Sequence, residues 1–147
     1  MRKIALTATF ALLILAVSGP SSRVSADAND LVNVLMQKLA VSKGQAKGGA
    51  GAIFNTVKGG VSTSEFSKVE KAVPGIPNLM KAAPKSSGMG SLLGGIGGGN
   101  SSMKLADSFT KLGLSPDQAG KFTTVVLDYV ESKGGSALRS VIQQALL

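Results

Sequence analysis

The 147-residue chain contains no cysteine and no histidine. These residues supply the thiol nucleophiles, most soft metal ligands and the usual general base near pH 7. Their absence leaves carboxylates, lysines and hydroxyls for chemistry, and it excludes disulfides and a lipid anchor on cysteine. We therefore expect a protein that is not an enzyme, with no catalytic residues, no metal site and no cofactor, held together by packing alone.

Acidic and aromatic residues are also scarce, with 8 Asp and Glu against 16 Lys and Arg, and 4% aromatic residues. Recognition of nucleic acids favours clustered arginines interleaved with aromatics. Here the lysines are spread along the chain, and Arg139 is the single arginine after residue 26. We expect no nucleic-acid partner; a solvated lysine surface and a weak peripheral association with anionic membrane or polysaccharide both stay open.

The first 26 residues have the pattern of a secretory signal peptide. A basic start precedes an apolar run over residues 4–17, and a small-residue cleavage site ends at Ala26. We expect cleavage there and export to the periplasm or the exterior; a retained anchor is the alternative, but the run is short for a membrane span. Three basic residues and no acids precede residue 27, so the mature net charge is 13 − 8 = +5.

One short segment occurs twice, as Lys38–Ala46 and, 73 positions later, as Lys111–Ala119. Lys, Leu, Ser, Gln and Ala match at the same offsets. Each copy is typical of a helix end, a short turn and a new helix start, with Ser at the N-cap and Gln three residues on, as in a capping box. The repeat predicts two related helical halves.

Apolar residues recur at helical spacing through both halves, and no persuasive strand pattern is present. In the first half, helices begin near Asn29, after Ser42 and after Ser62, where a further capping box ends at Glu65. Two prolines then break the third helix, and residues 78–83 could add one more turn. The starts expected in the second half are Met103, Ser115 and Ser136, with Ser136 capping the last helix.

The predicted fold class is therefore all-α, with two related three-helix halves packed into one small helical bundle and joined by a Gly/Ser-rich tether. The expected organisation is a signal peptide (1–26), a first helical half (27–85), the tether (86–102) and a second helical half (103–147). Gly/Ser-rich composition is typical of a flexible linker. Leu92 and Leu93 make this linker unusually apolar, and we expect them to dock on the helices or to contact the envelope.

Three glycines in four positions, Gly48, Gly49 and Gly51, lie on the apolar face of the second expected helix. A phosphate-binding loop is rejected, because such loops follow a strand and the Walker form ends in Gly-Lys-Ser/Thr. Each glycine costs a helix interior about 1 kcal/mol relative to alanine. We expect these residues at a close helix crossing or at a partner's binding surface.

Asp128 and Glu131 lie three residues apart on one expected helix and could share a site. A charged pair at this spacing is the ordinary outer face of a helix, and we favour that interpretation, with Lys133 beside them.

Several segments resemble an exported bacterial family of unknown function, the VcgC/VcgE-like family, and through it the all-helical YidB-like proteins. The matching segments are residues 31–35, 45–54, 73–77, 112–116, 125–130 and 134–137. The resemblance implies a helical fold and a signal peptide, and it supplies no activity, substrate or site residues.

Our functional hypothesis is a protein-interaction or structural module of the cell envelope with an unknown protein partner. The alternative is a basic protein that associates peripherally with the membrane or envelope through the Gly/Leu tether and the lysine surface. The sequence leaves the partner and the oligomeric state open.

Overall fold

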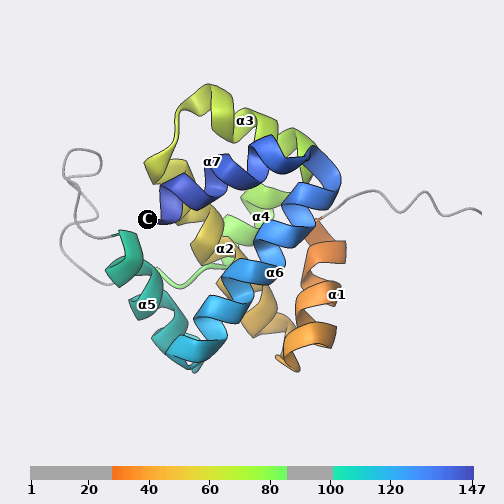
Figure 1. Ribbon diagram of the computed structural model, residues 1–147. Helices are drawn as coiled ribbons and strands as arrows, with labels where there is room; N and C mark the ends of the chain where they lie inside the picture. Colours follow the sequence, from red (N-terminus) through yellow and green to blue (C-terminus); the bar gives the residue numbers. More distant parts are fainter. Residues whose placement is uncertain (1–27, 86–100) are drawn as a thin grey trace, which may run out of the picture.

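The computed structural model describes residues 28–85 and 101–147, and every regular element in these ranges is an α-helix, which confirms the predicted all-α class (Figure 1). The predicted signal peptide and residues 86–100 of the tether, with Leu92 and Leu93, lie outside the described residues. The helices are α1 (Ala28–Leu39), α2 (Lys43–Gly60), α3 (Thr63–Ala72), α4 (Ile76–Ala82), α5 (Ser101–Lys111), α6 (Pro116–Gly134) and α7 (Ser136–Leu146).

Three helices begin with the predicted capping boxes. In α2, the Ser42 N–H donates to Gln45 Oε1 at 3.0 Å, and the Gln45 N–H donates to Ser42 Oγ at 3.2 Å. The same reciprocal pairs open α3 at Ser62 and α6 at Ser115. These bonds satisfy N–H groups that the first helical turn otherwise leaves without a partner.

Helix α2 lies at the centre and packs against every other helix that the structure describes. The core is one hydrophobic cluster with contributions from α1 to α7, and its largest fully buried side chains include Phe54, Phe109 and Phe122. The rings of Phe109 and Phe122 meet edge to face with centroids 5.2 Å apart, an arrangement that the ring quadrupoles favour.

Helices before and after the tether alternate in space. Helix α1 packs on α6, α5 packs on α2, and α3 and α7 contact each other and cover one end of the molecule (Figure 1). The described parts of the chain on either side of the tether therefore share one core.

The region before the tether has four helices, where we predicted three and a possible further turn over residues 78–83, which overlaps α4. Pro74 and Pro77 do interrupt α3, but Pro77 falls in the first turn of α4, where a missing N–H costs nothing. Gly75 makes the turn between them at φ 93. A seven-residue helix is marginal by itself, so the extensive packing of α4 on α2 stabilises it.

The structure also differs from the prediction at the starts of two helices. Ser136 does not cap α7: the N-cap is Gly135, which makes no side-chain cap bond and adopts φ 82 and ψ 172, a conformation that glycine tolerates. The turn from α6 to α7 therefore needs only one residue. Helix α5 begins at Ser101, within the predicted tether.

Candidate functional site

The three predicted glycines lie on the buried face of α2, at three different contacts. A Cβ on Gly51 would overlap the backbone of Leu79, so α2 and α4 touch backbone to backbone there. A Cβ on Gly49 would lie 2.6 Å from the Phe122 ring, and one on Gly48 2.6 Å from a methyl of Leu112. These glycines thus border three other parts of the fold.

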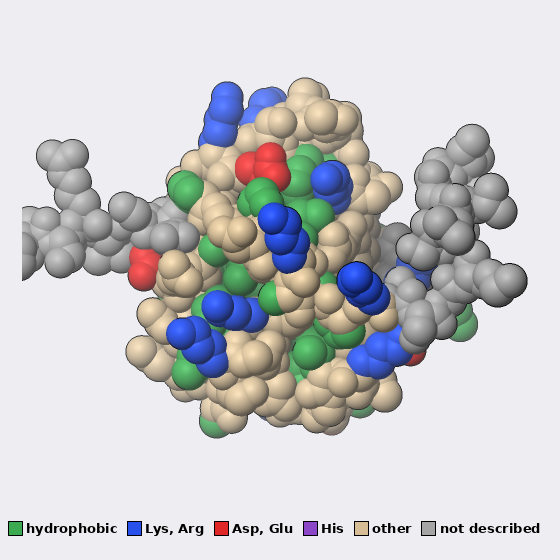
Figure 2. Space-filling view, turned by 180° about the vertical axis from the view of Figure 1, so that it is seen from behind, with side chains coloured by type: hydrophobic (Ala, Val, Ile, Leu, Met, Phe, Trp, Pro, Cys, Tyr) green, Lys and Arg blue, Asp and Glu red, His purple; other side chains and the backbone are tan. Residues whose placement is uncertain are grey.

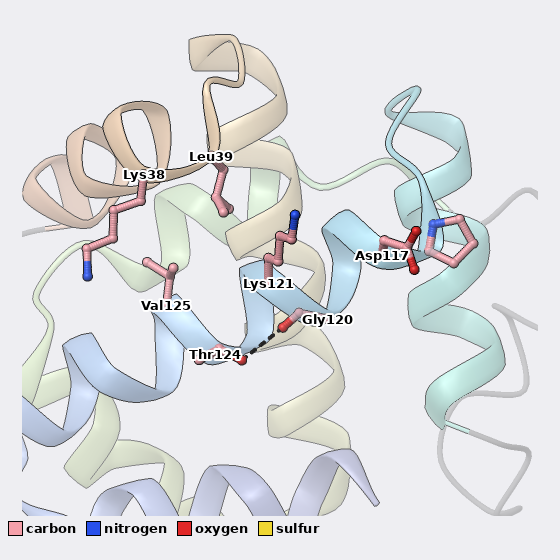
Figure 3. A pocket seen from close by; sticks show the side chains of 8 residues that line it. Lys38, Leu39, Asp117, Gly120, Lys121, Thr124 and Val125 are labelled. Atoms are coloured by element: carbon pink, nitrogen blue, oxygen red, sulfur yellow. Dashed lines mark hydrogen bonds between the residues drawn. The ribbon is translucent and has the colours of Figure 1, made fainter.

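A groove lies between the end of α1 and the first half of α6, and it is called here the α1/α6 groove. Its volume is about 710 Å³. Figure 3 shows the side chains of α6 along one wall and Leu39 reaching toward them from the end of α1. The lining residues are Lys38, Leu39, Pro116, Asp117, Gly120, Lys121, Thr124 and Val125.

Four of the eight residues that line the groove belong to the two copies of the repeated segment, and the other four follow the second copy on α6. Lys38 and Leu39 close the first copy's helix, whereas Pro116 and Asp117 open α6 in the second. Packing of α1 on α6 brings the two copies together. The repeat is visible in the sequence, but the groove is not, because only the tertiary arrangement places one end of each copy at a common groove.

The groove has an apolar floor and a basic edge. Val125 is buried and Leu39 half-buried, while Lys38 and Lys121 are exposed. Figure 3 shows Val125 between the two lysines, with Asp117 at the far end. Among the described residues, neither lysine forms an ion pair. A ligand with an apolar surface and an acidic group would therefore pack its apolar surface on the floor and place its acidic group near the lysines.

No set of groups for bond chemistry converges on this groove. The Thr124 hydroxyl donates to the Gly120 carbonyl at 3.1 Å, an ordinary helical back-bond. Within residues 28–85 and 101–147, no cluster of acidic side chains could hold a metal ion. The geometry is suited to binding.

A second groove lies on the other side of α6, between α5 and the end of α7, with a volume of about 390 Å³. Its walls include the apolar side chains of Leu105, Leu127 and Leu146, and it shares Pro116 and Gly120 with the α1/α6 groove. The start of α6 therefore separates the α1/α6 groove from the second groove.

Asp128 and Glu131 do converge, and their partner is Arg139 of α7. Arg139 Nη1 donates to Asp128 Oδ1 at 2.7 Å and to Glu131 Oε2 at 2.5 Å. The bond to Glu131, followed by that to Asp128, raises the pKa of the guanidinium. All three side chains are partly exposed, so the predicted outer face is correct in part, and sequence analysis missed the cation from α7.

The surface of α2 and α4 carries lysines and no acidic residue. Figure 2, which views the molecule from behind, shows basic side chains spread over a face with few acidic ones. The lysines of α2, of α4 and of the residues just after α4 are called here the basic face: Lys43, Lys47, Lys58, Lys81 and Lys85, of which Lys47 is half-buried and the others are exposed.

These features define a small all-helical protein with an open, lysine-edged groove and a basic face. In the described part of the chain, no helix has the length and apolarity needed to span a membrane. The model of a family described as "Protein of unknown function VcgC/VcgE (DUF2780)" matches residues 16–147, so the chain belongs to this family, and the resemblance to the VcgC/VcgE-like family is confirmed. No curated protein and no solved structure matches the chain.

Proposed function

We propose that this chain is an exported, non-enzymatic interaction module of the cell envelope that binds a protein partner in the α1/α6 groove. The observation that carries the proposal is the groove itself, an apolar floor beside two lysines that lack ion pairs among the described residues. Export is inferred from the signal-peptide pattern of residues 1–26. The absence of histidine and cysteine supports binding over catalysis.

Site-specific crosslinking in cells tests the proposal. A photoreactive amino acid at Thr124 faces the groove, and the same group at exposed Ser140 on α7 is the matched control. The expected result is a discrete protein adduct from position 124 that is absent from position 140 and weakened by Lys121→Glu. Identical adduct patterns from both positions, or none from position 124, would exclude the groove as the binding site.

A second candidate function follows from the basic face: peripheral association with an anionic membrane or polysaccharide, in which the leucines of the tether would assist. Each lysine near an anionic lipid surface contributes about 1 kcal/mol, and salt screens the attraction. Co-sedimentation with anionic vesicles over a salt series tests it. Lys47→Glu/Lys81→Glu should abolish binding, whereas Lys104→Glu on α5 should retain it; salt-independent binding would contradict the proposal.

We also infer that the two halves are related by duplication. The turns after α1 and α5 share an unusual backbone, since Ala40 and Gly113, at the same offset, both have positive φ, 51 and 71. The helix contacts are also reciprocal: α1 packs on α6 as α5 packs on α2, and α3 packs on α6 as α7 packs on α2. This pattern is that expected of a pseudo-two-fold arrangement, in which α4 has no counterpart.

A further inference from the structure

Helix α4 occupies a seat on α2 that consists of Gly48, Gly51 and Asn55. The Leu79 carbonyl lies over Gly51, and Asn55 Nδ2 donates to the Met80 carbonyl at 3.2 Å. At the 73-residue offset of the repeat, the corresponding positions on α6 are Lys121, Thr124 and Asp128. All three are exposed, and of the three Asp128 is bonded to Arg139 of α7.

The α1/α6 groove lies at the counterpart of the α4 seat. A Cβ on Gly48 would lie 2.6 Å from Leu112 and 3.4 Å from the carbonyl of Ala82, so this site is closed from both sides. The residue matched to Gly48 is Lys121, and the one matched to Leu112 is Leu39. Lys121 and Leu39 both line the α1/α6 groove. The carbonyl of Ala82 in α4 closes one side of the site at Gly48, whereas the lining of the groove includes no residue of α4.

We propose that the α1/α6 groove receives a short helix from a partner protein, in the manner in which α2 receives α4, and that this helix carries an acidic residue toward Lys121 and Lys38. The inference rests on the proposed function, which it deepens by naming the partner's element and charge. It also rests on the pseudo-two-fold relation between the halves.

The differences between the two seats determine how the partner helix lies. Thr124 replaces Gly51, so a helix cannot approach α6 backbone to backbone and must rest on side chains. Asp128 replaces Asn55 and is bonded to Arg139, so that end of the seat offers no amide donor and repels an acid. The partner's acidic residue is therefore confined to the lysine end, near the N-terminal half of α6.

The chain's own α4 provides a probe. The acidic probe is a synthetic peptide of residues 74–85 with Lys81 and Lys85 changed to glutamate, and the native-sequence peptide is its matched control. The acidic probe should bind the full chain, and the native peptide should bind several-fold more weakly because its lysines face Lys121. Fluorescence anisotropy of labelled probes measures both affinities.

Charge-reversal variants of the protein test where the acidic probe binds. Lys121→Glu should weaken binding of the acidic probe about fivefold, and Lys38→Glu/Lys121→Glu about tenfold or more. Lys43→Glu, on the basic face, should leave affinity within about twofold, since solvent and salt screen a distant charge. All of these lysines are exposed, and circular dichroism verifies that each variant is folded.

Disulfide trapping gives an independent measurement, because the chain has no cysteine of its own. Thr124→Cys should trap a cysteine-bearing acidic probe, and Ser140→Cys should not. An acidic probe that fails to bind at 1 mM, binds Lys121→Glu as tightly as the unchanged protein, or is trapped equally at both positions overturns the inference. If crosslinking in cells from position 124 still yields its protein adduct in that case, the proposed function stands and only the helical, acidic partner is rejected.

Discussion

Gly51 shows how one missing side chain determines the position of a helix. Because the Leu79 backbone occupies the space of a Cβ, Gly51→Ala should destabilise the protein by about 1–3 kcal/mol, as overpacking does. Gly59 is the matched control: nothing lies within 4 Å of its Cβ position, so Gly59→Ala should stabilise by about 1 kcal/mol. Urea unfolding measures both changes, and a gain in stability for Gly51→Ala would mean that α4 does not pack there.

Ala40 carries backbone strain that its counterpart in the repeat does not. At φ 51 it is the only described non-glycine residue with positive φ, whereas Gly113 adopts φ 71 without a Cβ penalty. Ala40→Gly should therefore stabilise the protein by about 0.5–1 kcal/mol, since relief of about 1–2 kcal/mol of strain exceeds the added entropy of the unfolded chain.

The same substitution at Ala106, an exposed position within α5, should have the opposite sign and cost about 1 kcal/mol. Thermal unfolding of the two variants side by side compares them directly. Equal destabilisation by both would show that the α1–α2 turn is not strained.

At the scale of one helix, the start of α3 gives a pH dependence. The Ser62 hydroxyl and then the Ser62 backbone N–H bond the Glu65 carboxylate and lower its pKa below the ordinary 4.5. A group whose pKa is lower in the folded state stabilises that state above its unfolded pKa, and the contribution is lost as the pH falls through the folded value.

Glu65→Gln keeps an acceptor for the Ser62 N–H but removes the titration. The unchanged protein should therefore be more stable than the variant at pH 7, and the difference should shrink as the pH falls below 4.5. Chemical unfolding across pH 3–7 provides the measurement. A difference that is the same at every pH would show that the carboxylate charge does not support this cap.

At the scale of the whole molecule, the helices on both sides of the tether form one core. A protease site introduced between residues 92 and 93, once cut, should give two fragments that co-elute in gel filtration and keep their helical circular dichroism. The physical reason is that α1, α2 and α3 bury apolar side chains against α5, α6 and α7. Fragments that separate and remain folded would instead be independent domains.

Much of the local structure could be predicted because its causes are local. The capping boxes at Ser42, Ser62 and Ser115 depend on groups three residues apart, so a short window of sequence contains the whole interaction. Helical periodicity likewise identified most of the helices. For α4 it indicated only a possible further turn over residues 78–83, because this helix is too short to show a period and is stabilised by contacts with α2.

The sequence by itself determined an all-helical chain, the places where most helices begin, the repeated turn, and the lack of residues for thiol, imidazole or disulfide chemistry. Only the tertiary structure decided which face of α2 seats α4, that Arg139 joins Asp128 and Glu131, and that Lys38 and Lys121 border one groove. The physical reason is the distance along the chain over which each kind of interaction acts. Caps and periods act within a turn or two of helix, whereas a seat or a groove exists only when packing brings together surfaces far apart in the chain.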